Sequence, residues 1–154
     1  MGGASWRLPY SNEISSNPFV LCVETAPPTP KARILVCDDL SEWREQLRNI
    51  LRARPEWQVI CEACNGHEAV QMAAEFQPNV VLLDIGMPIL NGLEAAEKIR
   101  EAAPSSKLIF VTMNGDGDLK TAALATGAEA YLLKANAGHE LLATIAAALD
   151  EHQD

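Results

Sequence analysis

Short apolar runs alternate along the chain with longer stretches in which apolar residues recur every three or four positions. The short runs predict strands of a sheet that is buried on both faces, and the longer stretches predict helices with one apolar side. Five such pairs follow one another from Arg33 onward. The predicted strands comprise residues 34–37, 59–61, 80–83, 108–111 and 131–133.

Each predicted strand is followed by a helix. The apolar stripes comprise Leu40, Trp43, Leu47, Ile50 and Leu51; Ala69, Met72, Ala73 and Phe76; Leu93, Ala96 and Ile99; an alanine-rich segment ending at Gly127; and Leu141, Leu142, Ile145 and Leu149. Asn65 with Glu68, and Asn91 with Glu94, have the spacing of a capping box at a helix start. Alanine buries little area, so we expect the fourth helix to pack loosely.

Strands alternating with helices predict an α/β fold, in which right-handed crossovers build a parallel sheet with helices on both faces. The flavodoxin-like, doubly wound (βα)5 arrangement, with strand order 2-1-3-4-5, makes the first and third strands neighbours. The whole pattern fits one domain over residues 31–150.

Residues 1–30 have a different composition, with five prolines among serine, asparagine and glycine. Such a segment has too little apolar surface to order itself, so we expect a disordered, proline-rich N-terminal tail. Residues 27–30, Pro-Pro-Thr-Pro, predict a stiff spacer before the domain. The alternative is a docking segment in which residues 19–23 add to a sheet edge or a groove.

The formal net charge of −9 argues against direct nucleic-acid binding by this chain through phosphate neutralisation. No secretory signal is evident, and no apolar stretch approaches the length of a membrane span. We expect a cytoplasmic protein with no membrane partner. The four cysteines, Cys22, Cys37, Cys61 and Cys64, lack a second metal-ligand pair and predict reduced thiols, two of them inside strands.

Polar residues with reactive groups follow four of the five predicted strands. Asp38 and Asp39 follow the first, Asp84 the third, Thr112 the fourth and Lys134 the fifth. The carboxyl ends of parallel strands lie on one sheet edge, so these residues can meet there. Three carboxylates in one place repel one another unless a cation or a proton intervenes, which predicts a divalent metal site.

This set of side chains suits phosphoryl transfer. Mg²⁺ prefers oxygen ligands and usually takes one or two carboxylates together with phosphate oxygens. Asp84 can act as a carboxylate nucleophile that forms an acyl phosphate. Lys134 supplies a positive charge and Thr112 a hydroxyl for the phosphate oxygens.

The chain resembles the receiver domain of bacterial two-component response regulators over about residues 31–150. The Asp38-Asp39 pair, Asp84 with Pro88 four residues later, Thr112, Tyr131 and Lys134 stand in that family's order and approximate spacing. The string Asp-Ile-Gly-Met-Pro-Ile-Leu-Asn-Gly-Leu-Glu-Ala, residues 84–95, is similar to the NarL/FixJ subgroup.

The resemblance implies that Asp84 accepts a phosphoryl group from a histidine kinase or a phosphotransfer protein. It implies Mg²⁺ bound by Asp39, Asp84 and the Gly86 backbone carbonyl, with Asp38 acting through water. It also implies that Thr112 and Tyr131 act as switch residues. These would remodel the face formed by the fourth helix, fifth strand and fifth helix for a downstream protein target.

Two departures from the family pattern bear on these expectations. The wider family often has a proline after the lysine, but here Ala135 follows Lys134. Residues other than proline also stand at this position in the NarL/FixJ subgroup, so we still expect Lys134 to reach the site. That subgroup usually carries a C-terminal helix-turn-helix domain, whereas this sequence stops at Asp154. The alternatives are a single-domain regulator and a truncated DNA-binding transcriptional regulator; a homodimer is open in either case.

Other functions fit the residues less well. A haloacid-dehalogenase-type phosphatase also forms an aspartyl phosphate, but it needs a second acid where Gly86 stands. A flavin-binding module would have a phosphate loop where Asp38 and Asp39 stand. A scaffold without chemistry would not need all five site positions. Taken singly, the Asp38-Asp39 pair could cap a helix and Tyr131 could be a core residue.

Overall fold

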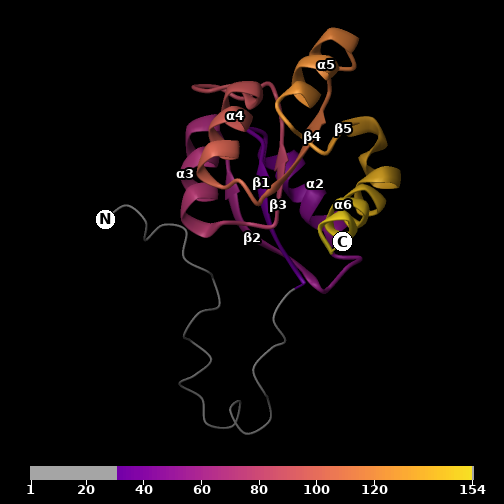
Figure 1. Ribbon diagram of the computed structural model, residues 1–154. Coiled ribbons are helices and arrows are strands. Elements are labelled where there is room, and N and C mark those ends of the chain that lie inside the picture. The colour runs from indigo at the N-terminus through magenta and orange to yellow at the C-terminus, as the bar shows by residue number, and fades with distance from the viewer. Residues whose placement is uncertain (1–30, 154) are drawn as a thin grey trace, which may run out of the picture.

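The computed structural model describes the backbone of residues 31–153 and the side chains of residues 31–150. Figure 1 shows one parallel sheet with helices on both of its faces. The expected N-terminal tail, with its spacer at residues 27–30 and its docking segment at 19–23, lies outside the described residues, as does Cys22.

The described elements follow the predicted alternation of strand and helix. They are β1 (Ala32–Cys37), α2 (Ser41–Leu51), β2 (Trp57–Ala63), α3 (Gly66–Phe76), β3 (Val80–Leu83), α4 (Gly92–Ala102), β4 (Lys107–Thr112), α5 (Gly117–Ala125), β5 (Ala130–Leu133), the short 3₁₀ turn η3 (Lys134–Asn136) and α6 (Ala137–Gln153). All strand pairs are parallel and the order is β2-β1-β3-β4-β5. The predicted doubly wound, flavodoxin-like fold is confirmed.

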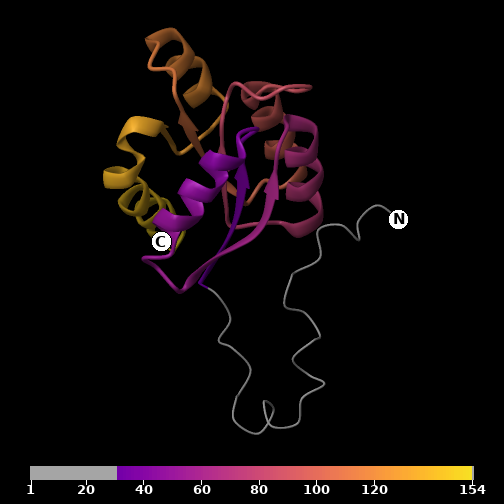
Figure 2. The same ribbon diagram turned by 180° about the vertical axis from the view of Figure 1, so that it is seen from behind.

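The sheet separates two hydrophobic layers. One packs against α3 and α4 and includes Leu35, Val81 and Phe110, while the other packs against α2 and α6. Figures 1 and 2 show these helix pairs on opposite sides of the sheet. Successive residues of β1 and β3 point into alternate layers, which explains why both strands are apolar throughout.

The two predicted capping boxes differ in the structure. At α4, Asn91 accepts a hydrogen bond from the Glu94 amide, and the Glu94 side chain accepts one from the Asn91 amide, so this box is complete. At α3, the Asn65 side chain also caps the helix, but Glu68 accepts from the Cys64 amide instead of the Asn65 amide. In the capping box of α3, the bond to the Glu68 side chain is therefore displaced by one residue, from the Asn65 amide to the Cys64 amide.

Two elements differ most from the predicted pattern. β2 is longer than residues 59–61 by two residues at each end, where the polar residues Gln58 and Glu62 interrupt the apolar run of this edge strand. Glu62 accepts from Arg44 at 3.0 Å and from Arg48 at 2.5 Å, so α2 covers its charge. The turn η3 was not predicted, since its three residues are too few to show a period.

Helix α5 is the least buried of the helices. Ala123 is its one fully buried residue, whereas α4 buries four residues. Leu124 is exposed on the surface of α5. Loose packing here follows from side-chain size, as predicted, because alanine offers few contacts to the sheet.

Two of the three cysteines in the described region serve packing, whereas Cys64 is exposed. Cys37 and Cys61 are buried free thiols beside α3. Burial raises the pKa of Cys37 well above its ordinary value and that of Cys61 to about 12, so both are protonated and unreactive at neutral pH.

No helix of the described chain is long and apolar enough to cross a bilayer.

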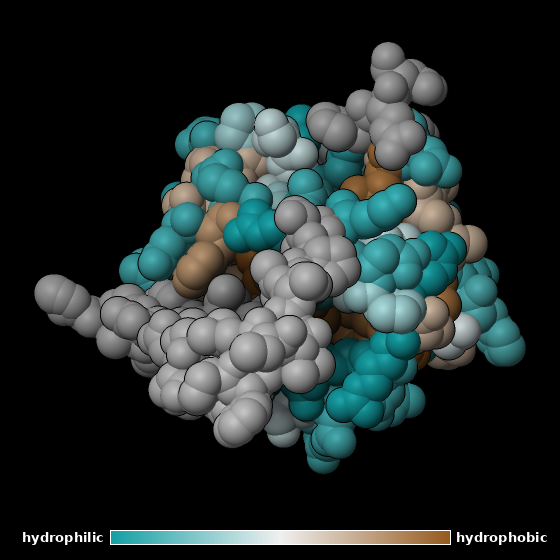
Figure 3. All heavy atoms as spheres, turned by 90° about the horizontal axis from the view of Figure 1, so that it is seen from below, coloured by the Kyte–Doolittle hydropathy of each residue, from teal (hydrophilic) through white to brown (hydrophobic). Residues whose placement is uncertain are grey.

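The sheet has two distinct edges. The chain enters at the amino ends of the strands, and Figure 3 views the molecule from that side, where hydrophilic side chains predominate among the residues coloured by hydropathy. The carboxyl ends lie on the opposite side. Beyond the ends of β1 and β3, the backbone amides of Asp38 and Asp84 donate to the carbonyls of Ala63 and Cys37, each at 3.0 Å. These bonds extend the sheet by one residue and fix both aspartates at the carboxyl edge.

Candidate metal and phosphoryl-transfer site

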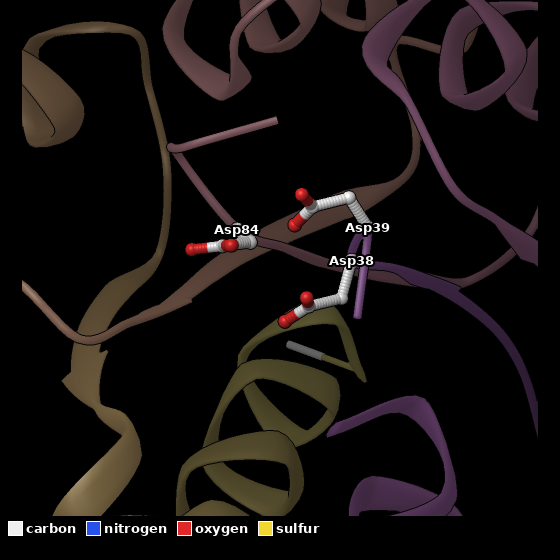
Figure 4. A group of neighbouring side chains, drawn as sticks. All are labelled: Asp38, Asp39 and Asp84. Atoms are coloured by element: carbon white, nitrogen blue, oxygen red, sulfur yellow. The ribbon is translucent and has the colours of Figure 1, made fainter. Parts of the chain in front are cut away.

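Three carboxylates converge at the carboxyl edge of the sheet. Each of Asp38, Asp39 and Asp84 offers an oxygen, and these oxygens lie within 4.8 Å of one another. Figure 4 shows the three side chains reaching into the same space from the ends of β1 and β3. β1 and β3 are neighbours, as the doubly wound order predicts, and this pairing brings together acids that lie far apart in the sequence.

Asp38 is the most deeply buried of the three, with 1% of its surface exposed. One carboxylate oxygen accepts from the Leu40 amide at 2.9 Å, and the other lies 2.7 Å from the Lys134 Nζ. Arg44 of α2 donates to the Asp38 backbone carbonyl at 2.8 Å. Asp38 is thus held from two directions, by the start of α2 through Leu40 and Arg44 and by Lys134 of η3.

Asp84 is buried but reaches the surface with part of its carboxylate. Its Oδ1 accepts from the Ile85 amide at 2.9 Å, and its Oδ2 lies 3.6 Å from the Lys134 Nζ. Burial raises the pKa of Asp84, and the charge of Asp38 raises it further. Lys134, the Thr112 hydroxyl and the Ile85 amide oppose the rise by favouring the charged form.

Lys134 and Thr112 complete the predicted set. Both are buried polar residues, and both follow or end strands at this edge. Lys134 begins η3, and this turn carries its ammonium back over the two buried carboxylates. All five reactive residues expected at the strand ends therefore meet in one place.

A hollow of about 350 Å³ opens above these groups to the surface. It is lined by Asp39, Leu40, Asp84, Ile85, Gly86, Thr112, Met113, Asn114, Leu119 and Lys134. Gly86 lies exposed at its rim, and a Cβ added to it would meet no atom within 4 Å. The hollow has room for a small oxyanion beside the reactive groups.

Tyr131 lies on β5, beside the site. It is half-buried, its ring centroid is 6.4 Å from that of Phe110, and its hydroxyl donates to the Asn114 carbonyl in the loop before α5. Burial, followed by the charges of Asp116 and Asp84, raises the pKa of Tyr131. The tyrosine thus joins β5 to the β4–α5 loop, which is more than a core residue would do.

Trp43 is a neighbour of the site that the sequence pattern assigned only to packing. Its ring centroid lies 5.0 Å from the Lys134 Nζ, close enough for a cation–π interaction. The signal available in the sequence was the closeness of Trp43 to the acidic pair, since it is the third residue of the helix that follows Asp38 and Asp39. Leu40 and Met113, both exposed at the hollow, were also not predicted as part of its rim.

The donor set fits a hard divalent cation. Three carboxylates offer oxygens that lie within 4.8 Å of one another, and one of the three acids, Asp39, is exposed. The pKa of Asp84 is raised first by burial and then by the charge of Asp38, and a bound cation would offset this second effect. Mg²⁺ and Ca²⁺ both accept such ligands, and the open hollow leaves room for the waters that Mg²⁺ retains.

Comparison with known proteins identifies the family to which the chain belongs. Residues 34–146 match the response regulator receiver domain. The transcriptional regulatory protein LnrK of Bacillus subtilis is 42% identical over 102 residues, which cover 66% of this chain and 46% of that protein. The nitrate/nitrite response regulator protein NarL of Escherichia coli is 37% identical over 112 residues, covering 72% of this chain and 51% of NarL.

Solved structures of response regulators share the fold and part of the sequence of this chain. The LuxR-family two-component response regulator from Aurantimonas is 31% identical, with a TM-score of 0.74, and the alignment covers 78% of this chain and 86% of that one. The response regulator domain of Thermotoga maritima CheB is 32% identical, with a TM-score of 0.72, over 77% and 96% of the two chains.

The chain spans about half the length of the curated relatives it matches. Those relatives include NarL-type regulators, as the string at residues 84–95 predicted. Sequence match, fold and the position of the acidic pocket agree: the protein belongs to the response regulator receiver domain family of two-component systems.

Proposed function

We propose that the protein is a phosphorelay receiver that accepts a phosphoryl group on Asp84. The observation that supports this most directly is the position of the Lys134 ammonium, 2.7 Å from Asp38 and 3.6 Å from Asp84, beside the exposed Asp39 carboxylate. One cation and three carboxylates around a surface hollow can hold both a metal ion and a phosphoryl group. Asp84 is the buried acid whose carboxylate also lines that hollow.

The phosphoryl donor in this proposal is a phosphohistidine of a histidine kinase or a phosphotransfer protein. An Asp84 carboxylate oxygen attacks phosphorus, and the P–N bond breaks with its electron pair staying on the histidine nitrogen, which takes up a proton from water. The product is an acyl phosphate on Asp84. Attack of water on phosphorus later releases inorganic phosphate and restores the carboxylate, so no external metabolite is turned over.

Asp39, Asp84 and the Gly86 carbonyl would hold Mg²⁺ directly, and Asp38 would act through a bound water. The ion supplies positive charge for the phosphoryl oxygens. Lys134 places a further positive charge on the same oxygens, and the Thr112 hydroxyl donates a hydrogen bond to them. These contacts stabilise the charge that the transferring group carries.

Thr112 and Tyr131 would couple the site to a surface. Thr112 ends β4, and the loop that follows carries the Asn114 carbonyl to which Tyr131 is bonded. A shift of Thr112 toward a phosphoryl group would move this loop. The orientation of the Tyr131 side chain would then change, because its hydroxyl is bonded to the Asn114 carbonyl. The face formed by α5, β5 and α6 would then bind a downstream protein target, or a second copy of the chain.

Incubation with acetyl phosphate and Mg²⁺, followed by intact mass spectrometry, tests the proposal. One phosphoryl group should be added to the wild-type protein, and none to the Asp84→Asn variant. Asp118→Asn, an exposed acid at the start of α5, is the matched control and should be phosphorylated as the wild type is. Unmodified wild-type protein, or equal modification of Asp84→Asn, would refute the assignment.

A further inference from the structure

Trp43 contacts the site from a direction that the proposed chemistry does not use. It lies in α2, partly buried against the layer between α2, α6 and the sheet. Its ring centroid is 5.0 Å from the Lys134 Nζ, inside the range of about 6 Å in which a ring face attracts an ammonium group. The lysine side chain is 3% exposed, so water screens this attraction little.

The Lys134 ammonium therefore has three neighbours of note in the described chain: the carboxylates of Asp38 and Asp84, and the Trp43 ring. In the proposed reaction both carboxylates change. Asp38 would face a bound metal ion, and the Asp84 carboxylate would become an acyl phosphate whose negative charge lies on the phosphoryl oxygens. The Trp43 ring is the neighbour that stays the same in every state.

We propose that Trp43 is a positioning residue that holds the Lys134 ammonium over the pocket while its carboxylate partners change. This inference rests on the proposed function. An unbranched four-carbon side chain has many rotamers, and fixing one costs conformational entropy at each step. A ring face opposite the carboxylates limits the lysine to positions from which it can reach the phosphoryl oxygens.

The role depends on the ring's negative face and not only on its volume. Phenylalanine keeps a weaker face and leucine keeps apolar bulk without one. We therefore expect phosphorylation by phosphoramidate at saturating Mg²⁺ to slow about three- to tenfold in Trp43→Leu and by less in Trp43→Phe. The Lys134→Met variant should be phosphorylated slowly whether or not Trp43 is also changed. The effects of the two substitutions on the phosphorylation rate should therefore not be additive.

Trp57 offers a matched control. It is the first residue of β2 and is buried at the amino end of that strand, whereas the site lies at the carboxyl ends of the strands. Its ring also lies beside a cation, since the Arg54 guanidinium carbon is 4.5 Å from the ring centroid. Trp57→Leu and Trp57→Phe should lower thermal stability but leave the phosphorylation rate per folded molecule unchanged. An equal loss of rate in the Trp57 variants would show that the Trp43 effect is only structural, and would overturn the proposal.

A spectroscopic measurement keeps the test decisive if Trp43→Leu does not fold. In a protein carrying Trp6→Phe and Trp57→Phe, Trp43 is the remaining tryptophan. Its emission responds to a charge near the ring, so Lys134→Met should change the emission of metal-free protein, whereas Lys107→Met should not. Identical emission with and without the Lys134 charge, or full phosphorylation rates in both Trp43 variants, would overturn the role of Trp43. Failure of Asp84 to be phosphorylated at all would instead overturn the proposed function.

Discussion

Asp38 has 1% of its surface exposed, and its charge is balanced chiefly by the Lys134 ammonium 2.7 Å away. A buried ion pair contributes little net stability, because both ions lose their hydration, but removing one partner leaves an uncompensated charge. The lysine thus has a structural task in addition to its chemical one: it keeps two buried acids compatible with the folded state.

Lys134→Met should therefore destabilise the metal-free protein by about 3 kcal/mol, since Asp38 and Asp84 would then repel each other in a buried setting. Mg²⁺ should restore more stability to this variant than it adds to the wild type, because the ion replaces the missing charge. Thermal unfolding with and without Mg²⁺ measures both effects. Lys107→Met, which breaks the more exposed pair with Glu129, should cost less than about 1 kcal/mol and show no Mg²⁺ dependence.

The pH dependence of stability follows from Asp84. Its folded-state pKa is raised above the ordinary 3.8, so between these two values the folded state binds more protons than the unfolded state. Stability contributed by the protonated form is then lost as the pH rises through this window. Asp84→Asn stays neutral, so it should have a larger free energy of unfolding in urea than the wild type at pH 7, and it should lose this advantage below both pKa values. A variant less stable than the wild type at pH 7 would contradict the prediction.

At the scale of elements, the start of α4 determines where Asp84 lies. A Cβ added to Gly92 would come 2.2 Å from the Asp84 carbonyl oxygen, and the Gly92 amide donates to the Ile85 carbonyl at 2.8 Å. The helix therefore packs with its backbone against the backbone of Asp84, the proposed phosphoacceptor. A side chain here would push the helix and the strand end apart.

Gly92→Ala should cost more than about 2 kcal/mol and should slow phosphorylation of Asp84, because the strain falls on that residue's own peptide group. Gly138→Ala in α6 is the matched control, since an added Cβ meets no atom within 4 Å there. That change should raise stability slightly, because alanine favours helix more than glycine does. Urea denaturation of both variants, with phosphorylation followed by mass spectrometry, tests the pair.

Helix α5 should be the least stable helix locally. It buries one residue, and its start lies in the loop that carries Asn114 and Asp116. We expect its amides to exchange with deuterium fastest among the helices of the described chain, and those of α4 to be among the slowest. Exchange in α5 as slow as in α4 would show that its packing is tighter than its alanines suggest.

The elements also show which parts of the fold the sequence could predict. Strands buried on both faces, such as β3, have continuous apolar runs and are recognised directly. The edge strand β2 alternates polar and buried residues and was predicted too short. The displaced cap at α3 depends on which amide Glu68 reaches, and spacing alone does not distinguish the Cys64 amide from that of Asn65.

For the whole molecule, the five reactive residues could be predicted because the carboxyl ends of parallel strands share one edge. The neighbour relation of β1 and β3 came from the fold pattern and not from any single run of residues. Trp43 was assigned to packing because its helical stripe explains it fully. Its contact with Lys134 depends on how α2 and α6 pack, which no local pattern encodes.

The domain boundaries are also testable. Both hydrophobic layers are built from residues between Ala32 and Leu149. A chain of residues 31–154 should therefore unfold cooperatively with a stability within about 1 kcal/mol of the full chain and accept phosphoryl on Asp84 at the same rate. A large loss of stability would show that residues 1–30 belong to the folded unit.

The order in which the site residues occur along the chain has a consequence for synthesis. Asp38, Asp39 and Asp84 leave the ribosome well before Lys134, so a nascent chain ending after β4 carries the three clustered acids without their cation. In the absence of a bound metal ion, repulsion among these acids would oppose the closure of β1 against β3 until β5 and η3 have been made.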